Sequence, residues 1–284
     1  MDVVPTTENI CSQLTFTGSK DEEEFQLATT RIELRGGEAL SLMIQILNEG
    51  PSMAPPRLAS LLHKISIVIN DLTQLLLAVR QDCDPEVFYH DVRPWFGGQT
   101  AERLWVFEGL EDRGELKKPT ELSGTTAGQS PLIHALDVFL GVNSFANSLG
   151  TSGITHPSSA GEVPDNIPNF LERMWSYMPQ AHRAFLRHIS SNPRPLRSLL
   201  MEFEDPEALG AYNTAVRALK GFRDAHIRIV TVYIMGPARR AQSQKEVVGG
   251  RGKGIQGTGG TNLATFLKGV RDLTANTVIS AERK

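Results

Sequence analysis

The stretch after Asp205 carries the most regular hydrophobic pattern in the chain. Asp205 and Pro206 suit an N-cap and a first helical residue, and apolar residues then recur at spacings of three and four as far as about Met235. This pattern predicts one long helix with one buried face. Two polar residues, Arg223 and His226, lie on that face one turn apart. Burying either without a partner is costly, and an anionic cofactor that carries a metal would satisfy both.

A lone histidine on an apolar helix face has a second interpretation. Such a residue is more often a hydrogen-bonded core histidine than a metal ligand. His134 also lies on an apolar helix pattern and is the alternative ligand if His226 is not one. From the helix alone both interpretations stay open.

Helical patterns also account for most of the remaining chain. An acidic cluster at residues 21–24 favours a helix start, and Gly36 with Gly37 is expected to break that helix. A short helix from Asp84 should end at Pro94, which places Arg93 near its last turn. Further helices are expected at about 38–48, 55–80, 132–140, 165–178, 180–190, 194–203 and 261–280.

The segments between these patterns are predicted to be irregular. Residues 1–20 are a lead-in rich in Thr, Ser and Asn, residues 104–107 form one possible short strand, and the Gly-rich stretch 236–260 is expected to be a mobile loop. The fold class is therefore expected to be all-α, with one helical domain over residues 21–284. No period of 20 to 50 residues recurs, which argues against a solenoid.

Composition narrows the class of protein. The 284 residues are 40% hydrophobic, which is enough for a sizeable core. Lys and Arg number 29 against 32 Asp and Glu, so a net charge of -3 gives no general basic field for nucleic acid or an anionic membrane. Cys11 and Cys83 are the only cysteines, and the N-terminus lacks an apolar signal core, so a cytoplasmic location is expected.

The longest apolar run, residues 65–79, includes Asn70 and Asp71. It is expected to be too short to span a bilayer and is interpreted as a buried helix.

Several enzyme motifs can be set aside. Residues 252–257 match G-x-G-x-x-G, but no predicted strand precedes them and no helix opens at their end, so a flexible loop is favoured over a dinucleotide site. His182 and His188 do not share one helix face cleanly for zinc, and Ser130 lacks a nucleophile-elbow context. Ordinary hydrolase chemistry is unsupported.

Five segments, in order along the chain, resemble motifs of the indoleamine 2,3-dioxygenase family. Each is weak alone, but five in order are specific, and the resemblance extends from about Leu14 to Ser280. The segments are the pocket stretch 83–98 (CDPEVFYHDVRPWFGG), the loop 124–130 (GTTAGQS), residues 177–183 (YMPQAHR), the R-x-x-H of residues 223–226, and the G-T-G-G-T of residues 257–261.

The resemblance implies b-type haem and a reaction in tryptophan catabolism through kynurenine. Members of this family insert both atoms of O2 across the C2–C3 bond of the indole of tryptophan to give N-formylkynurenine. His226 would be the proximal iron ligand and Arg223 the partner of a haem propionate. Phe88 would pack on the indole, and Arg93 would hold the substrate carboxylate. Without the resemblance, Phe88 reads as ordinary core and Arg93 as a solvated helix end.

Four further residues receive roles from the same resemblance. Phe25 aligns with an aromatic residue and Thr29 with a hydroxyl residue near the oxygen site, on the distal side of the haem. Thr126 supplies a hydroxyl that could contact substrate or O2, and Thr258 lies in the loop that closes over substrate. A core Phe and an exposed Thr are the plain alternatives for Phe25 and Thr29.

The resemblance also raises an expectation about the distal pocket. Family members carry a smaller helical domain ahead of the haem domain, whereas this chain begins shortly before Phe25, so that roof is expected to be absent. A dimer or a separate small-domain partner would then be needed for strong activity. The alternative is a truncated or diverged haem-binding relative with little catalysis, and product formation distinguishes the two.

Overall fold

A computed structural model describes residues 4–99, 105–109, 122–142, 167–192, 195–246 and 263–280. Within these ranges every regular element is a helix or a helical turn, so the expected all-α class is confirmed.

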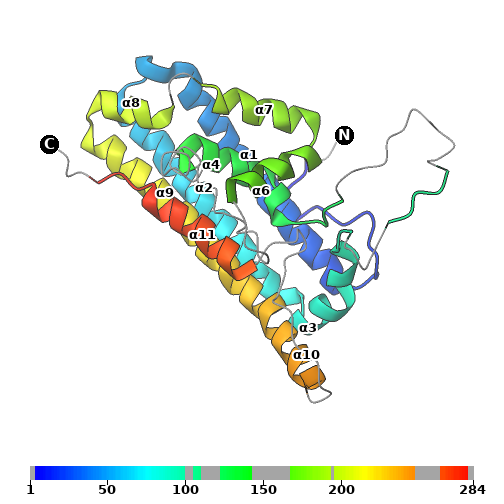
Figure 1. Cartoon of the computed structure of the whole chain (residues 1–284). Helices are drawn as coiled ribbons and strands as arrows, with labels where there is room; N and C mark the ends of the chain where they lie inside the picture. The colour runs from blue at the N-terminus through cyan, green and yellow to red at the C-terminus, as the bar shows by residue number, and fades with distance from the viewer. Residues whose placement is uncertain are drawn as a thin grey trace, which may run out of the picture.

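Four long helices form the body of the molecule. Helices α1 (Lys20–Glu49) and α2 (Pro55–Asp82) are joined by the short turn η1 (Gly50–Ser52), which makes them antiparallel neighbours. Helix α9 (Pro206–Val230) packs along α2, and α11 (Leu263–Asn276) lies along α9 (Figure 1). Helix α2 is therefore covered by α1 and α9.

Shorter helices lie at one end of this body. They are α4 (Pro131–Leu140), α6 (Ile167–Met174), α7 (Gln180–Ser190) and α8 (Leu196–Phe203). Figure 1 shows them grouped at the top of the view, and α4 contacts α1, α7, α8 and α9. Helix α4 thus connects this group to the long helices.

The long helices begin where the sequence places caps. The Ser19 hydroxyl accepts a hydrogen bond from the Glu22 backbone N–H at 3.2 Å, and acidic residues fill the first turn of α1. The Asp205 carboxylate accepts from the Ala208 N–H at 2.8 Å, with Pro206 as the first helical residue of α9. The predicted starts of these helices are confirmed.

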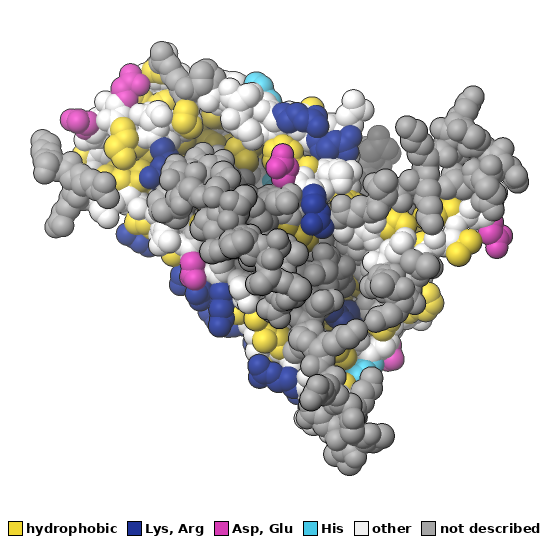
Figure 2. Space-filling model, in the orientation of Figure 1, with side chains coloured by type: hydrophobic (Ala, Val, Ile, Leu, Met, Phe, Trp, Pro, Cys, Tyr) yellow, Lys and Arg dark blue, Asp and Glu magenta, His cyan; other side chains and the backbone are white. Residues whose placement is uncertain are grey.

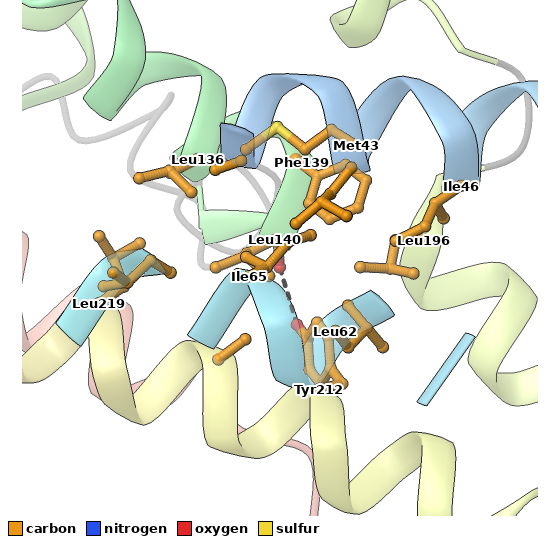
Figure 3. Packing of buried hydrophobic residues seen from close by; sticks show 14 of the residues in the cluster. Met43, Ile46, Leu62, Ile65, Leu136, Phe139, Leu140, Leu196, Tyr212 and Leu219 are labelled. Atoms are coloured by element: carbon orange, nitrogen blue, oxygen red, sulfur yellow. Dashed lines mark hydrogen bonds between the residues drawn. The ribbon is translucent and has the colours of Figure 1, made fainter. Parts of the chain in front are cut away.

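The core is centred on Tyr212 of α9, which is fully buried. Its hydroxyl donates to the carbonyl oxygen of Leu140 at 2.7 Å, the bond drawn in Figure 3. Aliphatic side chains from α1, α2, α4, α8 and α9 surround this bond, among them Met43, Ile46, Leu62, Ile65, Leu136, Leu196 and Leu219. One hydrogen bond therefore joins α9 to the end of α4 inside an apolar cluster.

Gly36 and Gly37 do not break a helix, contrary to the sequence prediction. Helix α1 runs through both. A Cβ on Gly36 would overlap the side chain of Leu132, whereas one on Gly37 would meet nothing within 4 Å. Gly36 therefore provides the close approach between α1 and α4, and it is not a turn residue.

The segment after Asp84 is more irregular than one short helix. Helix α3 (Pro85–Val87) passes into a π-helical turn, η2 (Phe88–Val92), and then into a 3-10 turn, η3 (Arg93–Phe96). The helical stretch ends at Val92 with Arg93 as its C-cap, which agrees with the predicted end near Pro94. Pro94 itself lies in the first positions of the new turn, where proline is tolerated.

Two loop predictions also need correction. Trp105 to Phe107 form no strand, and Leu104 lies outside the described residues. Helix α9 ends at Val230, a π-helical turn η6 (Thr231–Met235) follows, and helix α10 (Gly236–Glu246) continues the same rod (Figure 1). The predicted loop at 236–260 is therefore wrong for residues 236–246, and residues 247–260 lie outside the described part.

Helix α2 is long and apolar enough, by length and composition alone, to cross a membrane. This helix extends beyond the apolar run of residues 65–79. Leu62, Ile65 and Ile69 on α2 are fully buried against α1 and α9, which confirms the prediction of a buried core helix.

The surface carries mixed charge. In the face that Figure 2 shows, Lys and Arg side chains are spread over several elements with Asp and Glu between them. This distribution agrees with the near balance of basic and acidic residues in the sequence.

Candidate functional site

His226 lies on α9, one turn after Arg223. Burial, followed by the charge of Arg223, lowers the pKa of His226 to about 4, so the ring is neutral near pH 7. No hydrogen bond or ion pair engages either ring nitrogen among the residues that the structure describes. A neutral imidazole without such a partner keeps a nitrogen lone pair free for a metal.

Arg223 is held by two side chains from other helices. It is 7% exposed, and its Nη2 donates to both carboxylate oxygens of Asp137 on α4, at 2.6 and 2.7 Å. Its Nη1 donates to the Thr274 hydroxyl of α11. The buried guanidinium therefore joins α9, α4 and α11 behind His226, and its role toward a propionate stays a prediction.

Aromatic rings from four segments form a cluster that includes Phe88. Phe25 of α1 and Phe88 of η2 have ring centroids 4.5 Å apart, and Tyr233 of η6 meets Phe88 edge-on at 5.8 Å. Phe96 of η3 stacks on Phe25 at 5.5 Å. Phe25 and Phe88, both predicted to bind substrate, are therefore in direct contact.

Tyr233 connects this aromatic cluster to the helix of His226. It follows His226 by seven residues, which corresponds to about two helical turns or roughly 10 Å along the axis. Its hydroxyl donates to the carbonyl oxygen of Cys83 at 2.6 Å, which fixes the end of α2 against η6. The rod of α9 and η6 thus carries both the candidate ligand and one wall of the aromatic cluster.

Arg93 lies between Phe88 and Phe96 in sequence. Its guanidinium carbon is 5.4 Å from the centre of the Tyr89 ring, within the range of a cation–π contact. Burial lowers the pKa of Arg93 and the nearby Tyr89 raises it, yet an arginine stays protonated at any pH of interest. A charged, partly buried guanidinium thus lies next to the aromatic cluster in the chain.

The segment that carries Thr126 packs against the segment of Arg93. The Thr125 N–H donates to the Phe96 carbonyl oxygen at 3.1 Å, and the Gln99 N–H to the Leu122 carbonyl oxygen at 2.8 Å. A Cβ on Gly124 would overlap the Phe96 carbonyl oxygen, so this contact requires glycine. The structure therefore brings Thr126 near η3.

The two candidate catalytic threonines differ in how their hydroxyl groups are used. Thr29 is exposed on α1, and its hydroxyl donates to the Gln26 carbonyl oxygen at 2.8 Å. The Thr126 oxygen accepts a hydrogen bond from the Gly128 N–H at 3.4 Å, and no described residue takes its proton. Thr126 is therefore the better placed donor of the two. Thr258 lies outside the described residues.

His134 has a structural role in this arrangement. Its Nδ1 accepts a hydrogen bond from the Trp175 indole N–H at 2.9 Å, so Nε2 carries the proton and donates to the Gly128 carbonyl oxygen at 2.7 Å. Both nitrogens are engaged, which disfavours His134 as the alternative metal ligand. This pair and the Ser130 hydroxyl, which donates to Glu33, fix the end of the Thr126 segment.

The donor set suits an iron carried by a macrocycle better than a bare ion. Among the described residues, no three His, Cys, Asp or Glu side chains are grouped to hold a metal. A single free imidazole is what a haem requires as an axial ligand. His226 therefore fits haem.

One feature of the sequence points to the partner of Arg223. Asp137 is a single carboxylate within the very apolar helix α4, and such a residue indicates a buried cation nearby. Thr274 on α11 and Phe96 in η3 gave no comparable signal, because both occur in ordinary amphipathic or loop patterns.

Comparison with known proteins gives a consistent match. A family model described as indoleamine 2,3-dioxygenase matches residues 2–277. Indoleamine 2,3-dioxygenase 2 of Homo sapiens is 30% identical over 274 residues, which cover 95% of this chain and 62% of that protein. Indoleamine 2,3-dioxygenase of Saccharomyces cerevisiae is 34% identical over 292 residues, with the same two coverages. Indoleamine 2,3-dioxygenase nanC of Aspergillus nanangensis is 30% identical over 281 residues, with 63% of that protein covered.

The chain spans about three-fifths of the length of these relatives, since the matches cover 62% to 63% of them. The likeness includes the segments that carry His226, Phe88 and Arg93, because the family match runs through all three.

Proposed function

Because the chain belongs to the indoleamine 2,3-dioxygenase family, we propose that it binds b-type haem through His226 and opens the indole ring of tryptophan with O2. Both oxygen atoms of O2 enter the product, N-formylkynurenine, as the C2–C3 bond of the indole breaks. The observation that carries the proposal is the partly buried, neutral imidazole of His226, which no described residue engages.

When bound, haem supplies the iron at which O2 is activated. The chain's own residues have simpler tasks. His226 stays neutral because burial lowers its pKa, so its lone pair needs no deprotonation to bind iron. Asp137 and Thr274 hold Arg223, and thereby fix α9 against α4 and α11 on the side of His226.

Substrate binding is assigned to the aromatic cluster and Arg93. Phe88 is 4% exposed and packs on the partly buried Phe25, so an indole would meet this pair mainly through Phe25. Aromatic pairs contribute about 0.5 to 1.5 kcal/mol beyond simple burial. The guanidinium of Arg93 suits the carboxylate of an amino acid in a bidentate pair. The Thr126 hydroxyl accepts a hydrogen bond from the Gly128 N–H, and its own proton can be donated to the substrate or to O2.

The cofactor assignment is tested with His226→Ala. The protein, reconstituted with haem, should show a Soret band that shifts with dithionite and CO, and His226→Ala should lose that band or most of its intensity. His134→Gln is the matched control, because the ring of His134 is engaged by Trp175 and Gly128 and should not be needed for haem. A Soret band that survives in His226→Ala and disappears in His134→Gln would reverse the assignment.

The substrate assignment is tested with Arg93→Ala. Loss of a charged hydrogen bond of about 1.5 to 3 kcal/mol should weaken the tryptophan-induced spectral shift by about ten- to a hundredfold, with haem content unchanged. Formation of N-formylkynurenine under ascorbate and methylene blue then tests turnover. An unchanged shift in Arg93→Ala would show that Arg93 does not bind the carboxylate, and absence of product from the wild-type protein would contradict the proposed reaction.

A further inference from the structure

The aromatic cluster extends beyond the residues assigned to substrate. Phe16, in the segment before α1, meets Phe96 edge-on with ring centroids 6.3 Å apart. It also stacks on Trp95 at 5.5 Å with the rings only 6° from parallel. Since Phe96 stacks on Phe25, the rings form one continuous series from the candidate substrate residues to Phe16.

One buried carboxylate holds Phe16 in this position. Glu22 of α1 is fully buried, and its Oε1 accepts hydrogen bonds from the Phe16 N–H at 2.8 Å and from the Gln26 side chain at 3.0 Å. Its Oε2 accepts from the Thr17 N–H at 2.6 Å and from the Thr17 hydroxyl at 2.7 Å. The carboxylate thus accepts four hydrogen bonds, and two of them hold the backbone N–H groups of Phe16 and Thr17.

The rest of the segment follows α1 as well. The Ser12 N–H donates to Glu23 at 3.3 Å, and Arg31 Nε donates to the Thr7 carbonyl oxygen at 3.2 Å. Residues 7–17 are therefore attached to α1 at three levels, and Phe16 is directed toward η3 from the side of Phe25.

Burial does not explain this placement of Phe16. The residue remains 61% exposed and Trp95 51% exposed, so neither gains the full stabilisation of a core aromatic residue. An anchored yet exposed ring at the end of an aromatic series suits the outer wall of a binding site for a flat aromatic ligand.

We propose that Phe16 is a specificity-determining residue, and that its ring, positioned by Glu22, forms the outer wall of the indole site and limits the size of substituents on the indole ring. The inference rests on the proposed function, because it takes Phe25 and Phe88 as the residues that contact the indole. Glu22 is a positioning residue that acts through Phe16.

The test compares the affinities of haem-loaded proteins for L-tryptophan and for its 5-benzyloxy and 6-benzyloxy derivatives, measured by calorimetry. Phe16→Ala removes the wall, so the ratio of the larger of the two benzyloxy affinities to the tryptophan affinity should rise by about three- to tenfold. Phe16→Trp enlarges the wall and should lower that ratio. Leu14→Ala, in the same segment and 85% exposed, is the matched control and should leave it unchanged.

Glu22→Gln tests the positioning role. Whichever oxygen becomes the amide nitrogen, one backbone N–H, of Phe16 or of Thr17, then faces a donor. The segment should therefore loosen, and the ratio should move in the direction of Phe16→Ala. The double variant should match Phe16→Ala alone, because Glu22 acts through that ring.

Three results would overturn the inference. The first is a ratio that stays within about twofold of wild type in both Phe16 variants. The second is a failure of both benzyloxy compounds to bind Phe16→Ala. The third is a wild-type protein that binds no tryptophan, which removes the proposed function as well. Normal tryptophan binding with an unchanged ratio leaves the proposed function intact and removes only the role of Phe16.

Discussion

At the scale of single residues, burial decides which ion pairs matter. Arg223 and Asp137 are 8% and 4% exposed in their side chains and form a two-oxygen contact. Asp137→Ala would leave the guanidinium buried without its counter-charge, which should cost about 3 to 5 kcal/mol of unfolding free energy. Urea unfolding of the haem-free protein measures the loss.

The pair of Lys220 and Asp224, on the same helix, is the control for this prediction. It lies at i and i+4 with side chains 41% and 26% exposed, so Lys220→Ala should cost no more than about 0.5 kcal/mol. The joint variant Asp137→Leu with Arg223→Met should be less harmful than Asp137→Ala alone, because no charge is left unpaired. Equal losses for Lys220→Ala and Asp137→Ala would show that the buried pair is not special.

At the scale of helices, the contact of α1 with α4 depends on the missing side chain of Gly36. Gly36→Ala adds a methyl group that overlaps Leu132, itself 1% exposed, and should destabilise the protein by about 1 to 3 kcal/mol. Gly37→Ala, one residue later with open space around it, should stabilise by about 0.5 to 1 kcal/mol, since glycine is a poor helix former.

Thermal unfolding of the two glycine variants gives the comparison directly. Opposite signs at adjacent positions are the expected result. A stabilising Gly36→Ala would mean that Leu132 moves away at little cost and that the two helices are not held at this distance by the glycine.

The same glycines show why some of the architecture could not be predicted from sequence. Caps such as Asp205 act within one turn, so the start of α9 was predictable. The reason for Gly36 lies in Leu132, nearly a hundred residues away, and no local pattern reveals it. Likewise, the spacing of Arg223 and His226 indicated a special face on α9, and the single carboxylate of the apolar helix α4 indicated a buried cation. That Asp137 pairs with Arg223 depends on how α4 packs against α9, which no local pattern shows.

At the scale of the whole molecule, acid should loosen the packing of the Thr126 segment. Burial lowers the pKa of His134 below its ordinary value of 6.5; the Gly128 carbonyl and Asp137 oppose this, and Arg223 adds to it. The His134 ring therefore binds a proton at a higher pH in the unfolded chain than in the folded protein. Stability from this group is complete above pH 6.5 and is lost as the pH falls below it, by at most about 1.4 kcal/mol per pH unit.

Urea unfolding of the haem-free protein from about one pH unit above the ordinary histidine pKa of 6.5 to about one unit below it measures this slope. His134→Gln cannot titrate and should reduce the slope over that interval. Glu22 affects stability at lower pH. Burial raises the pKa of its carboxyl group, but the hydrogen bonds from Phe16, Thr17 and Gln26 outweigh burial and lower the pKa below 4.5. The stability that Glu22 provides is therefore lost only as the pH falls below 4.5. An identical slope in His134→Gln would show that His134 does not titrate with unfolding.

The π-helical turn η6 has a consequence for how this chain tolerates insertions and deletions. A π-turn holds one residue more than an α-turn, so it rotates everything after it by about 100° relative to an uninterrupted helix. Helix α10 begins immediately after η6, and Arg240 on α10 pairs with Glu86 of α3. Deleting Val232, which precedes Tyr233, would leave a longer, regular helix, yet it would turn both Tyr233 away from Phe88 and Arg240 away from Glu86. The extra residue therefore sets the rotation of the part of the rod that contacts α3 relative to the part that holds His226.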